Sequence, residues 1–203
     1  YRMGDTTVDI VDLPGTYSLT AYSMEELVAR NFLVNEKPAV VVDIVDAANL
    51  ERNLYLAIQF MEMGVPVVIA LNMMDVAHKR GIHIDTHKLE EMLGVHVEPI
   101  VARRGHGVPE LMKTVFQVAE QKHESLNLKI SYGEDMDRAI SEMTAEIEAT
   151  DFLVGRYRSK WIALKYLEGD HEILDLGHKH NPIVAQKLAT EAERLGRHIR
   201  KTT

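Results

Sequence analysis

The sequence predicts an α/β fold, in which a doubly wound, mostly parallel sheet is followed by a small all-helical unit. Between residues 8 and 121, short β-branched runs alternate with stretches of helical periodicity, as in sheets covered by helices on both faces. From residue 122 onward the alternation stops, and the helical stretches have no convincing strand between them. We therefore expect one domain at residues 1–121 and a second at residues 122–203, joined by the polar segment 121–127.

The composition is that of an ordinary globular protein. The 203 residues are 46% apolar and 27% charged, and no apolar run is long enough to span a bilayer. The chain has no cysteine, which excludes disulfides and thiolate metal sites and fits a reducing cytosolic setting. A net charge of −8 argues against a broad nucleic-acid surface, because such surfaces depend on Lys and Arg meeting phosphates.

The first element is expected at residues 8–11, which read as a short buried strand ended by the turn formers Pro14 and Gly15. Gly4 and Asp5 before it are typical of a hairpin turn whose first strand is mostly missing. Because the chain has no initiator methionine and starts so close to this strand, we interpret it as a fragment.

The remaining elements follow in alternation. Ser23 with Glu26 forms a capping-box pattern, which predicts a helix from there to about residue 35. Further strands are expected at residues 39–45, 65–71 and 95–101, and further helices at residues 49–63, from about 85 to 93, and from 109 to about 121. The second domain should contain helices at residues 134–149, 155–167 and 181–200.

Three polar signatures come at the ends of buried strands. Asp12 and Gly15 follow the first strand, Asn72 and Asp75 follow the third, and Ala102 follows the fourth. The carboxyl ends of parallel strands form the edge where open α/β sheets bind ligands. The sequence therefore predicts that these residues line one ligand site.

The second signature suits a guanine base. Guanine presents N1–H and N2–H₂ side by side, and the Asp75 carboxylate can accept both, whereas adenine has no such pair of donors. Asn72 can bridge the base edge and neighbouring loops, and a backbone N–H near Ala102 can donate to the guanine O6. The alternative is structural: Asn72 forms an Asx turn and Asp75 lies at a helix start.

Together these signatures resemble GTPase motifs. Residues 12–15 resemble the third motif, Asn72-x-x-Asp75 the fourth, and Ala102-Arg103 the fifth. More specifically, residues 12–19, 45–56 and 70–75 resemble the amino-terminal GTPase domain of FeoB-type ferrous iron transporters, and Met73 replaces the lysine of most GTPases. The resemblance covers residues 8–121, and the helical domain is similar to the membrane-proximal, GDP-dissociation-inhibitor-like domain of that family.

The resemblance implies binding and hydrolysis of GTP, coupled to ferrous iron transport at the cytoplasmic face of the bacterial inner membrane. Asp12 would hold Mg²⁺ through a water, and the Gly15 N–H would meet the γ-phosphate. The second switch would begin at Thr16, where Ras-like enzymes carry a water-orienting glutamine, so no catalytic residue is assigned and slow hydrolysis is expected. The implied partners are guanine nucleotide and the transmembrane part of the same transporter, and not nucleic acid. A potassium requirement and homo-oligomers are left open.

The sequence departs from the family pattern at several points. The phosphate-binding loop Gly-x-x-x-x-Gly-Lys-[Ser/Thr] and the first switch are absent from these 203 residues, so we expect the chain alone to bind GTP poorly and to be inactive. Val101 replaces the serine common in the fifth motif, which weakens the assignment of the O6 contact. Two other functions remain open: an Era-like or TrmE-like GTPase acting on RNA or ribosomes, and a catalytically dead interaction module.

The histidines of the helical domain suggest one further alternative. His178 and His180, near His171 and Asp175, could form a metal site, but this spacing is more typical of a solvated connecting loop.

Overall fold

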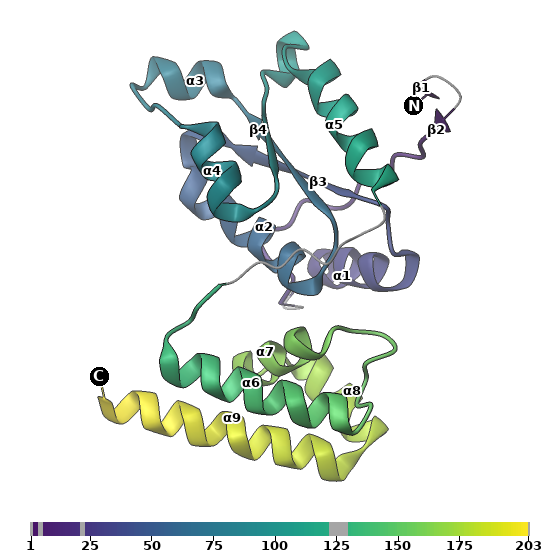
Figure 1. Ribbon diagram of the computed structural model, residues 1–203, viewed down its shortest axis with the longest axis vertical. Helices are drawn as coiled ribbons and strands as arrows, with labels where there is room; N and C mark the ends of the chain where they lie inside the picture. Colours follow the sequence, from purple (N-terminus) through teal and green to yellow (C-terminus); the bar gives the residue numbers. More distant parts are fainter. Residues whose placement is uncertain (1, 4–5, 21–22, 122–129, 203) are drawn as a thin grey trace.

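The computed structural model describes residues 2–3, 6–20, 23–121 and 130–202. Two domains lie end to end along the long axis of the molecule, a sheet domain followed by a helical domain (Figure 1). This arrangement confirms the predicted fold class of an α/β sheet followed by helices.

The described sheet contains three parallel strands in the order β3 (Val41–Asp46), β4 (Val67–Asn72) and β5 (His96–Pro99). Asp43 pairs with Ile69, and Ile69 pairs with Val97. The first five residues of the central strand β4 are buried, as the β-branched run predicted. The parallel order brings the carboxyl ends of the strands to one edge of the sheet.

Helices cover both faces of the sheet, which confirms the doubly wound prediction. On one face, strand residues such as Ile69 pack with Leu33 of α1 (Met24–Glu36) and Phe60 of α2 (Leu50–Met63). On the other face, Val68 and Ala70 pack with Leu111 and Val115 of α5 (Val108–Glu120). The remaining elements are α3 (Met74–Lys79), α4 (Thr86–Leu93) and the 3-10 helices η1 (Ala47–Asn49) and η2 (Ala102–Arg104).

Helix ends in the sheet domain follow the expected capping chemistry. Ser23 and Glu26 form a reciprocal capping box at the start of α1, and Asp85 caps α4 through the Lys88 N–H. Gly64 and Gly94 end α2 and α4 in the left-handed conformation.

The strand predicted at residues 8–11 is wrong. These residues are irregular, and Ile10 and Val11 are 68% and 56% exposed. A strand needs a neighbour for its N–H and C=O groups, and the described sheet has the order β3-β4-β5, in which residues 8–11 take no part. The hairpin before them is confirmed by the pairing of β1 (Arg2–Met3) with β2 (Thr6–Thr7), although its turn at residues 4–5 lies outside the described residues.

The helical domain contains α6 (Glu134–Ala149), α7 (Ser159–Glu168), α8 (His171–His180) and α9 (Pro182–Thr202). Its core gathers side chains from all four helices, among them Ile147, Trp161, Ile173 and Leu188. None of the helices in the described part of the chain is long and apolar enough to cross a membrane.

Two predictions in this domain need correction. The helix expected at residues 155–167 begins only at Ser159, because residues 150–158 form turns in which Asp151 and Leu153 adopt positive φ. Residues 171–180 form helix α8 and not a loop, because Asp170 caps it and Ile173 anchors it in the core. The predicted linker at residues 121–127 lies outside the described residues from residue 122 onward.

Candidate nucleotide site

The base-binding residues predicted from sequence meet at the carboxyl end of β4. Asn72 ends the strand, Met73 follows in the left-handed conformation with φ 63°, and Asp75 lies in the first turn of α3. The Ala102 N–H donates to Asn72 Oδ1 at 3.0 Å. This bond joins the fourth and fifth motifs, which are 30 residues apart in the chain.

The loop that carries Ala102 is held from both sides. The Ile100 N–H donates to the Leu71 carbonyl at 2.8 Å, and the Val101 N–H donates to the His106 carbonyl at 3.0 Å. Gly107 closes the loop with φ 76°, and a Cβ there would lie 2.3 Å from the Pro99 carbonyl oxygen, so only glycine fits. Val101 and Arg103 therefore belong to a loop whose path is fixed next to Asn72.

Asp75 faces a cation in this structure. Its Oδ2 lies 3.8 Å from an Arg104 guanidinium nitrogen, and its side chain is 22% exposed. A carboxylate in this position can exchange that contact for the paired N–H donors of a guanine edge. The Ala102 N–H is already bonded to Asn72, so a guanine O6 would have to share that N–H or use a neighbouring one.

The structure places the predicted phosphate-sensing residues in an irregular segment. We call residues 72–75 and 101–107 together the base loop. Asp12 and Gly15 are exposed, and no hydrogen bond between described residues joins either of them to the base loop. In the described part of the chain, no group of three or more His, Asp or Glu side chains could hold a metal ion. The described residues around Asp12 therefore do not form a Mg²⁺ site by themselves.

The segment after Gly15 is tied to helix α1. Thr16 Oγ1 donates to the Ser18 carbonyl at 2.6 Å, and Ser18 Oγ donates to Glu26 Oε1 at 2.5 Å. Leu19 is fully buried, and its N–H donates to Gln59 Oε1 at 2.6 Å. The region predicted as the second switch, from Thr16 to about Met24, is therefore anchored at Ser18 and Leu19.

Arg30 of α1, which the sequence analysis missed, links this segment to the helical domain. Its guanidinium is fully buried, donates to the Leu19 carbonyl at 3.3 Å and pairs with Asp170 at 2.6 Å and with Glu172. It also lies 5.6 Å from the centre of the Trp161 ring. The sequence carries no signal for this cluster, because its acidic partners lie 140 and 142 residues away.

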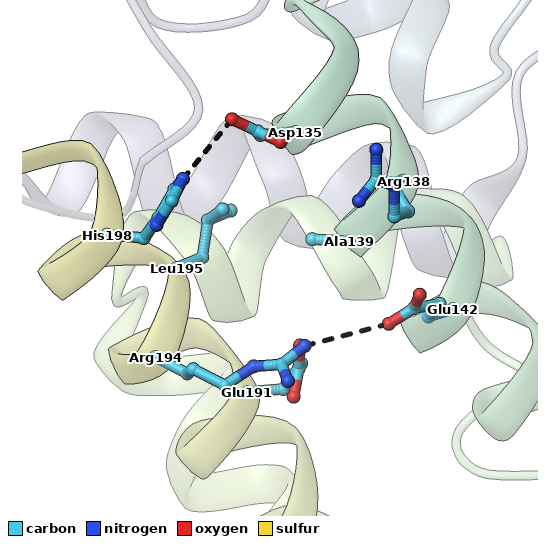
Figure 2. Close-up of a pocket in the computed structure, with 8 residues that line it drawn as sticks. All are labelled: Asp135, Arg138, Ala139, Glu142, Glu191, Arg194, Leu195 and His198. Atoms are coloured by element: carbon cyan, nitrogen blue, oxygen red, sulfur yellow. Dashed lines mark hydrogen bonds and ion pairs between the residues drawn. The ribbon is translucent and has the colours of Figure 1, made fainter. Parts of the chain in front are cut away.

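A second charged region, between α6 and α9, has the character of a surface ion-pair network. In this groove of about 280 Å³, Asp135 faces His198 at 3.5 Å and Glu142 faces Arg194 at 3.9 Å (Figure 2). Side chains this exposed form weak, solvated pairs that hold one helix against another. The groove shows no acid–base or metal-binding arrangement.

Comparison with known proteins agrees with the sheet-and-helix architecture. The family described as "Ferrous iron transport protein B" matches residues 1–115, and the family described as "FeoB cytosolic helical domain" matches residues 132–203. A fusion of Fe(2+) transport protein A with Fe(2+) transporter FeoB from Porphyromonas gingivalis is 44% identical over 85% of this chain and 21% of its own length. Fe(2+) transporter FeoB from Staphylococcus aureus is 34% identical over 98% of this chain and 29% of its own length. The chain thus spans less than a third of these relatives.

Solved structures match either the sheet domain or nearly the whole chain. The cytosolic domain of the T. maritima FeoB iron transporter in its GMPPNP form has a TM-score of 0.81 at 27% identity, covering 98% of this chain and 82% of that one. The FeoB G-domain from Methanococcus jannaschii is 53% identical, with a TM-score of 0.54 over 55% of this chain and 71% of that one. An S. thermophilus NFeoB variant bound to GDP.AlF4- has a TM-score of 0.79 at 31% identity, covering 93% and 71%. The chain therefore belongs to the FeoB family of ferrous iron transport proteins and comprises its N-terminal G domain and its cytosolic helical domain.

Proposed function

We propose that this chain binds guanine nucleotides through the loops after β4 and β5, and that GTP binding and hydrolysis regulate ferrous iron transport. The Asn72–Ala102 hydrogen bond at 3.0 Å is the observation that carries this proposal, because it joins the two base-reading motifs beside Asp75. Asp75 is the acceptor for guanine N1–H and N2–H₂, and the loop at Val101, Ala102 and Arg103 meets the O6 side of the base.

The roles proposed for residues at the phosphates of the nucleotide are supported by membership of the FeoB family. Asp12 is the candidate ligand of Mg²⁺ through a water, and the Gly15 N–H is the candidate donor to the γ-phosphate. Both need the phosphate-binding loop, which is absent from these 203 residues, so no hydrolytic step is assigned to the residues described. Thr16 stands where Ras-like enzymes carry the water-orienting glutamine, and its shorter side chain already donates to the Ser18 carbonyl, so slow hydrolysis is proposed.

The rest of the proposal concerns the whole protein. The two domains would act at the cytoplasmic face of the bacterial inner membrane and would signal the nucleotide state to the transmembrane part of the same transporter. GTP and GDP with Mg²⁺ are the proposed cofactors, and K⁺ is a further candidate. An RNA-directed role is disfavoured by the net charge of −8, since RNA binding draws on cationic surface.

Replacing Asp75 by Asn in the full-length protein tests the base assignment. Loss of a charge-assisted contact of about 1.5–3 kcal/mol should weaken GDP binding by about 10- to 100-fold, because each 1.4 kcal/mol is about tenfold in affinity. Xanthosine diphosphate should gain affinity, because its C2 carbonyl can accept from the new amide. Titration calorimetry with both nucleotides measures these changes.

Asp85→Asn is the matched control, because Asp85 is exposed and Asn can still cap α4 through the Lys88 N–H. The control should bind GDP as the wild type does. Unchanged GDP affinity in Asp75→Asn would exclude Asp75 as the reader of the base. If the wild-type full-length protein binds no guanine nucleotide, a catalytically dead interaction module becomes the better description.

A further inference from the structure

A crevice of about 740 Å³ lies between the two domains, far from the base loop. One wall is formed by the turn after α1 and the turn after α2, which lead into the amino ends of β3 and β4. The other wall is formed by α6 and by the segment that leads into α7. The base loop lies at the opposite, carboxyl ends of the same strands. The crevice is therefore distinct from the nucleotide site.

The charge of the crevice is opposite to that of the whole chain. Lys37, Arg156, Arg158 and Lys160 line it, against the single acid Glu148, in a chain with a net charge of −8. Arg158 donates to the Gly64 carbonyl at 3.1 Å. Within the described ranges, the other three cations form no salt bridge with an acidic side chain. An anion entering the crevice would meet these cations, of which Lys160 also interacts electrostatically with Glu62 and Asp137.

The rest of the lining is apolar and aromatic. Leu33 and Met63 contribute from the sheet domain, and Tyr157 and Trp161 contribute from the helical domain. The rings of Tyr157 and Trp161 stack with centroids 4.9 Å apart. Trp161 Nε1 is buried and has no hydrogen-bond partner in the part of the chain that the structure describes. This wall suits the apolar portion of a ligand.

The backbone around the crevice is unusual. The described non-glycine residues with positive φ are Met73, Lys37, Asp151 and Leu153. Met73 belongs to the base loop, Lys37 lines the crevice, and Asp151 and Leu153 precede Val154, which also lines it. Such conformations cost about 1–3 kcal/mol each and gather at binding sites, where the surrounding structure holds them. Their positions single out the base loop and this crevice.

We propose that the crevice binds a small organic anion, a phosphate or carboxylate carried on an apolar group. Its volume falls within the range of about 300–1,000 Å³ that small-molecule sites occupy, and such sites favour domain interfaces. An inorganic anion would leave the apolar wall uncovered, and a neutral apolar molecule would leave the cations unpaired. A ligand that touches both walls would bridge the two domains.

Trp161 makes this proposal directly measurable, because it is the only tryptophan of the chain. Its fluorescence should change saturably when the 203-residue chain is titrated with phenyl phosphate or with phenylacetate, and the stronger of the two identifies phosphate or carboxylate as the preferred group. Inorganic phosphate and benzyl alcohol test the charge and the ring separately. Each should bind at least about tenfold more weakly than the preferred anion, a difference of about 1.4 kcal/mol.

The double variant Arg156→Ala/Lys160→Ala should lose at least about tenfold in affinity for the preferred anion. Lys88→Ala, on the exposed surface of α4, is the matched control and should bind as the wild type does. Added NaCl should weaken binding of the anion and leave benzyl alcohol unaffected, which tests the charge without any substitution. The proposal is overturned if neither anion gives a saturable response, if benzyl alcohol binds equally well, or if binding is independent of salt.

Discussion

Asp43 is a carboxyl group buried in the core of the sheet domain. It lies on β3 on the same face as Val41 and Val45, and its Oδ2 has no hydrogen-bond partner among the described residues. Burial raises the pKa of Asp43 from 3.8 to about 7, because the apolar surroundings disfavour the charged form. Asp43 is not part of the base loop, but its raised pKa should make the free energy of unfolding depend strongly on pH.

The sign of that effect follows from proton linkage. Between about pH 4 and pH 7 the folded chain holds a proton on Asp43 that the unfolded chain has lost, so the free energy of unfolding should fall as pH rises. The loss should reach at most about 4 kcal/mol, at about 1.4 kcal/mol per pKa unit, and should level off above about pH 7. Urea unfolding across this range measures it. Asp43→Asn should flatten the slope and Asp85→Asn should not; an equal slope in Asp43→Asn would contradict the assignment.

Gly64 is a second residue with a measurable role, because a side chain of the other domain packs on it. Its φ is +78°, and a Cβ there would lie 1.8 Å from the Arg158 guanidinium carbon. Gly64→Ala should therefore displace Arg158 and also strain the left-handed backbone, which alone costs about 1–2 kcal/mol. Gly94→Ala is the matched control, because Gly94 has φ +69° and no atom within 4 Å of its Cβ position.

The difference between these two variants isolates the contact with Arg158. By chemical denaturation, Gly64→Ala should be the more destabilising substitution. In an Arg158→Ala background the two should cost the same, because only backbone strain remains. A difference that persists without the Arg158 side chain would show that the guanidinium is not the cause.

At the scale of single residues, the sequence predicted that the loops after β4 and β5 come together, and it did not predict the contact between the domains. Asn72, Asp75 and Ala102 could be predicted because each follows a recognisable buried strand, and parallel strands bring their ends together. Arg30 reads as an ordinary helix residue, and its importance depends on Asp170 in another domain. Pairing over that distance is set by domain packing, which leaves no periodic pattern in the sequence.

Helix α8 depends on a cap that also serves the domain contact. Asp170 accepts from the Ile173 N–H at 3.1 Å as N-cap and pairs with Arg30 at 2.6 Å through its other oxygen. Two substitutions separate these roles. Asp170→Asn keeps a capping oxygen but removes the charge that balances a buried guanidinium, whereas Asp170→Ala removes both.

Asp170→Asn should destabilise the chain by about 3–5 kcal/mol, because it leaves a buried charge without its closest partner. Glu172 remains near Arg30 and should keep the loss toward the lower end of that range. Asp170→Ala should cost about 1 kcal/mol more, the usual value of an N-cap. Urea unfolding monitored by circular dichroism gives both values. Equal losses would mean that the cap contributes nothing, and no loss in Asp170→Asn would contradict the ionic role.

At the scale of elements, the predictions succeeded where residues close in the sequence determine the structure. They failed where contacts with a distant part of the chain determine it. Helix α1 was predicted from its capping box, and α5 from the proline in its first turn. Residues 8–11 have strand composition but belong to neither of the described sheets, and they are irregular. Helix α8 was missed because its polar, histidine-rich face hides the buried Ile173.

For the molecule as a whole, the contact between the two domains contains both apolar packing and polar or charged pairs. Val34 of α1 is part of the apolar core of the helical domain, and Met63 of α2 packs against it. Tyr132 donates to Glu62, and burial raises the pKa of both side chains. The buried Arg30 cluster lies beside these contacts. An interface that shares a core in this way should make the two domains unfold together.

Arg30→Met tests whether the domains unfold as one unit. Trp161 is the only tryptophan and lies in the helical domain against Arg30, so its fluorescence reports that domain and its contact with α1, whereas far-ultraviolet circular dichroism reports helices of both domains. In the wild type the two urea transitions should coincide. In Arg30→Met, Asp170 loses its closest cation while most apolar contacts remain, so stability should fall and the two midpoints should separate.

Arg52→Met is the control, because Arg52 stacks on Tyr17 within the sheet domain and should leave the transitions coincident. Coincident transitions in Arg30→Met would mean that the apolar contacts alone couple the domains.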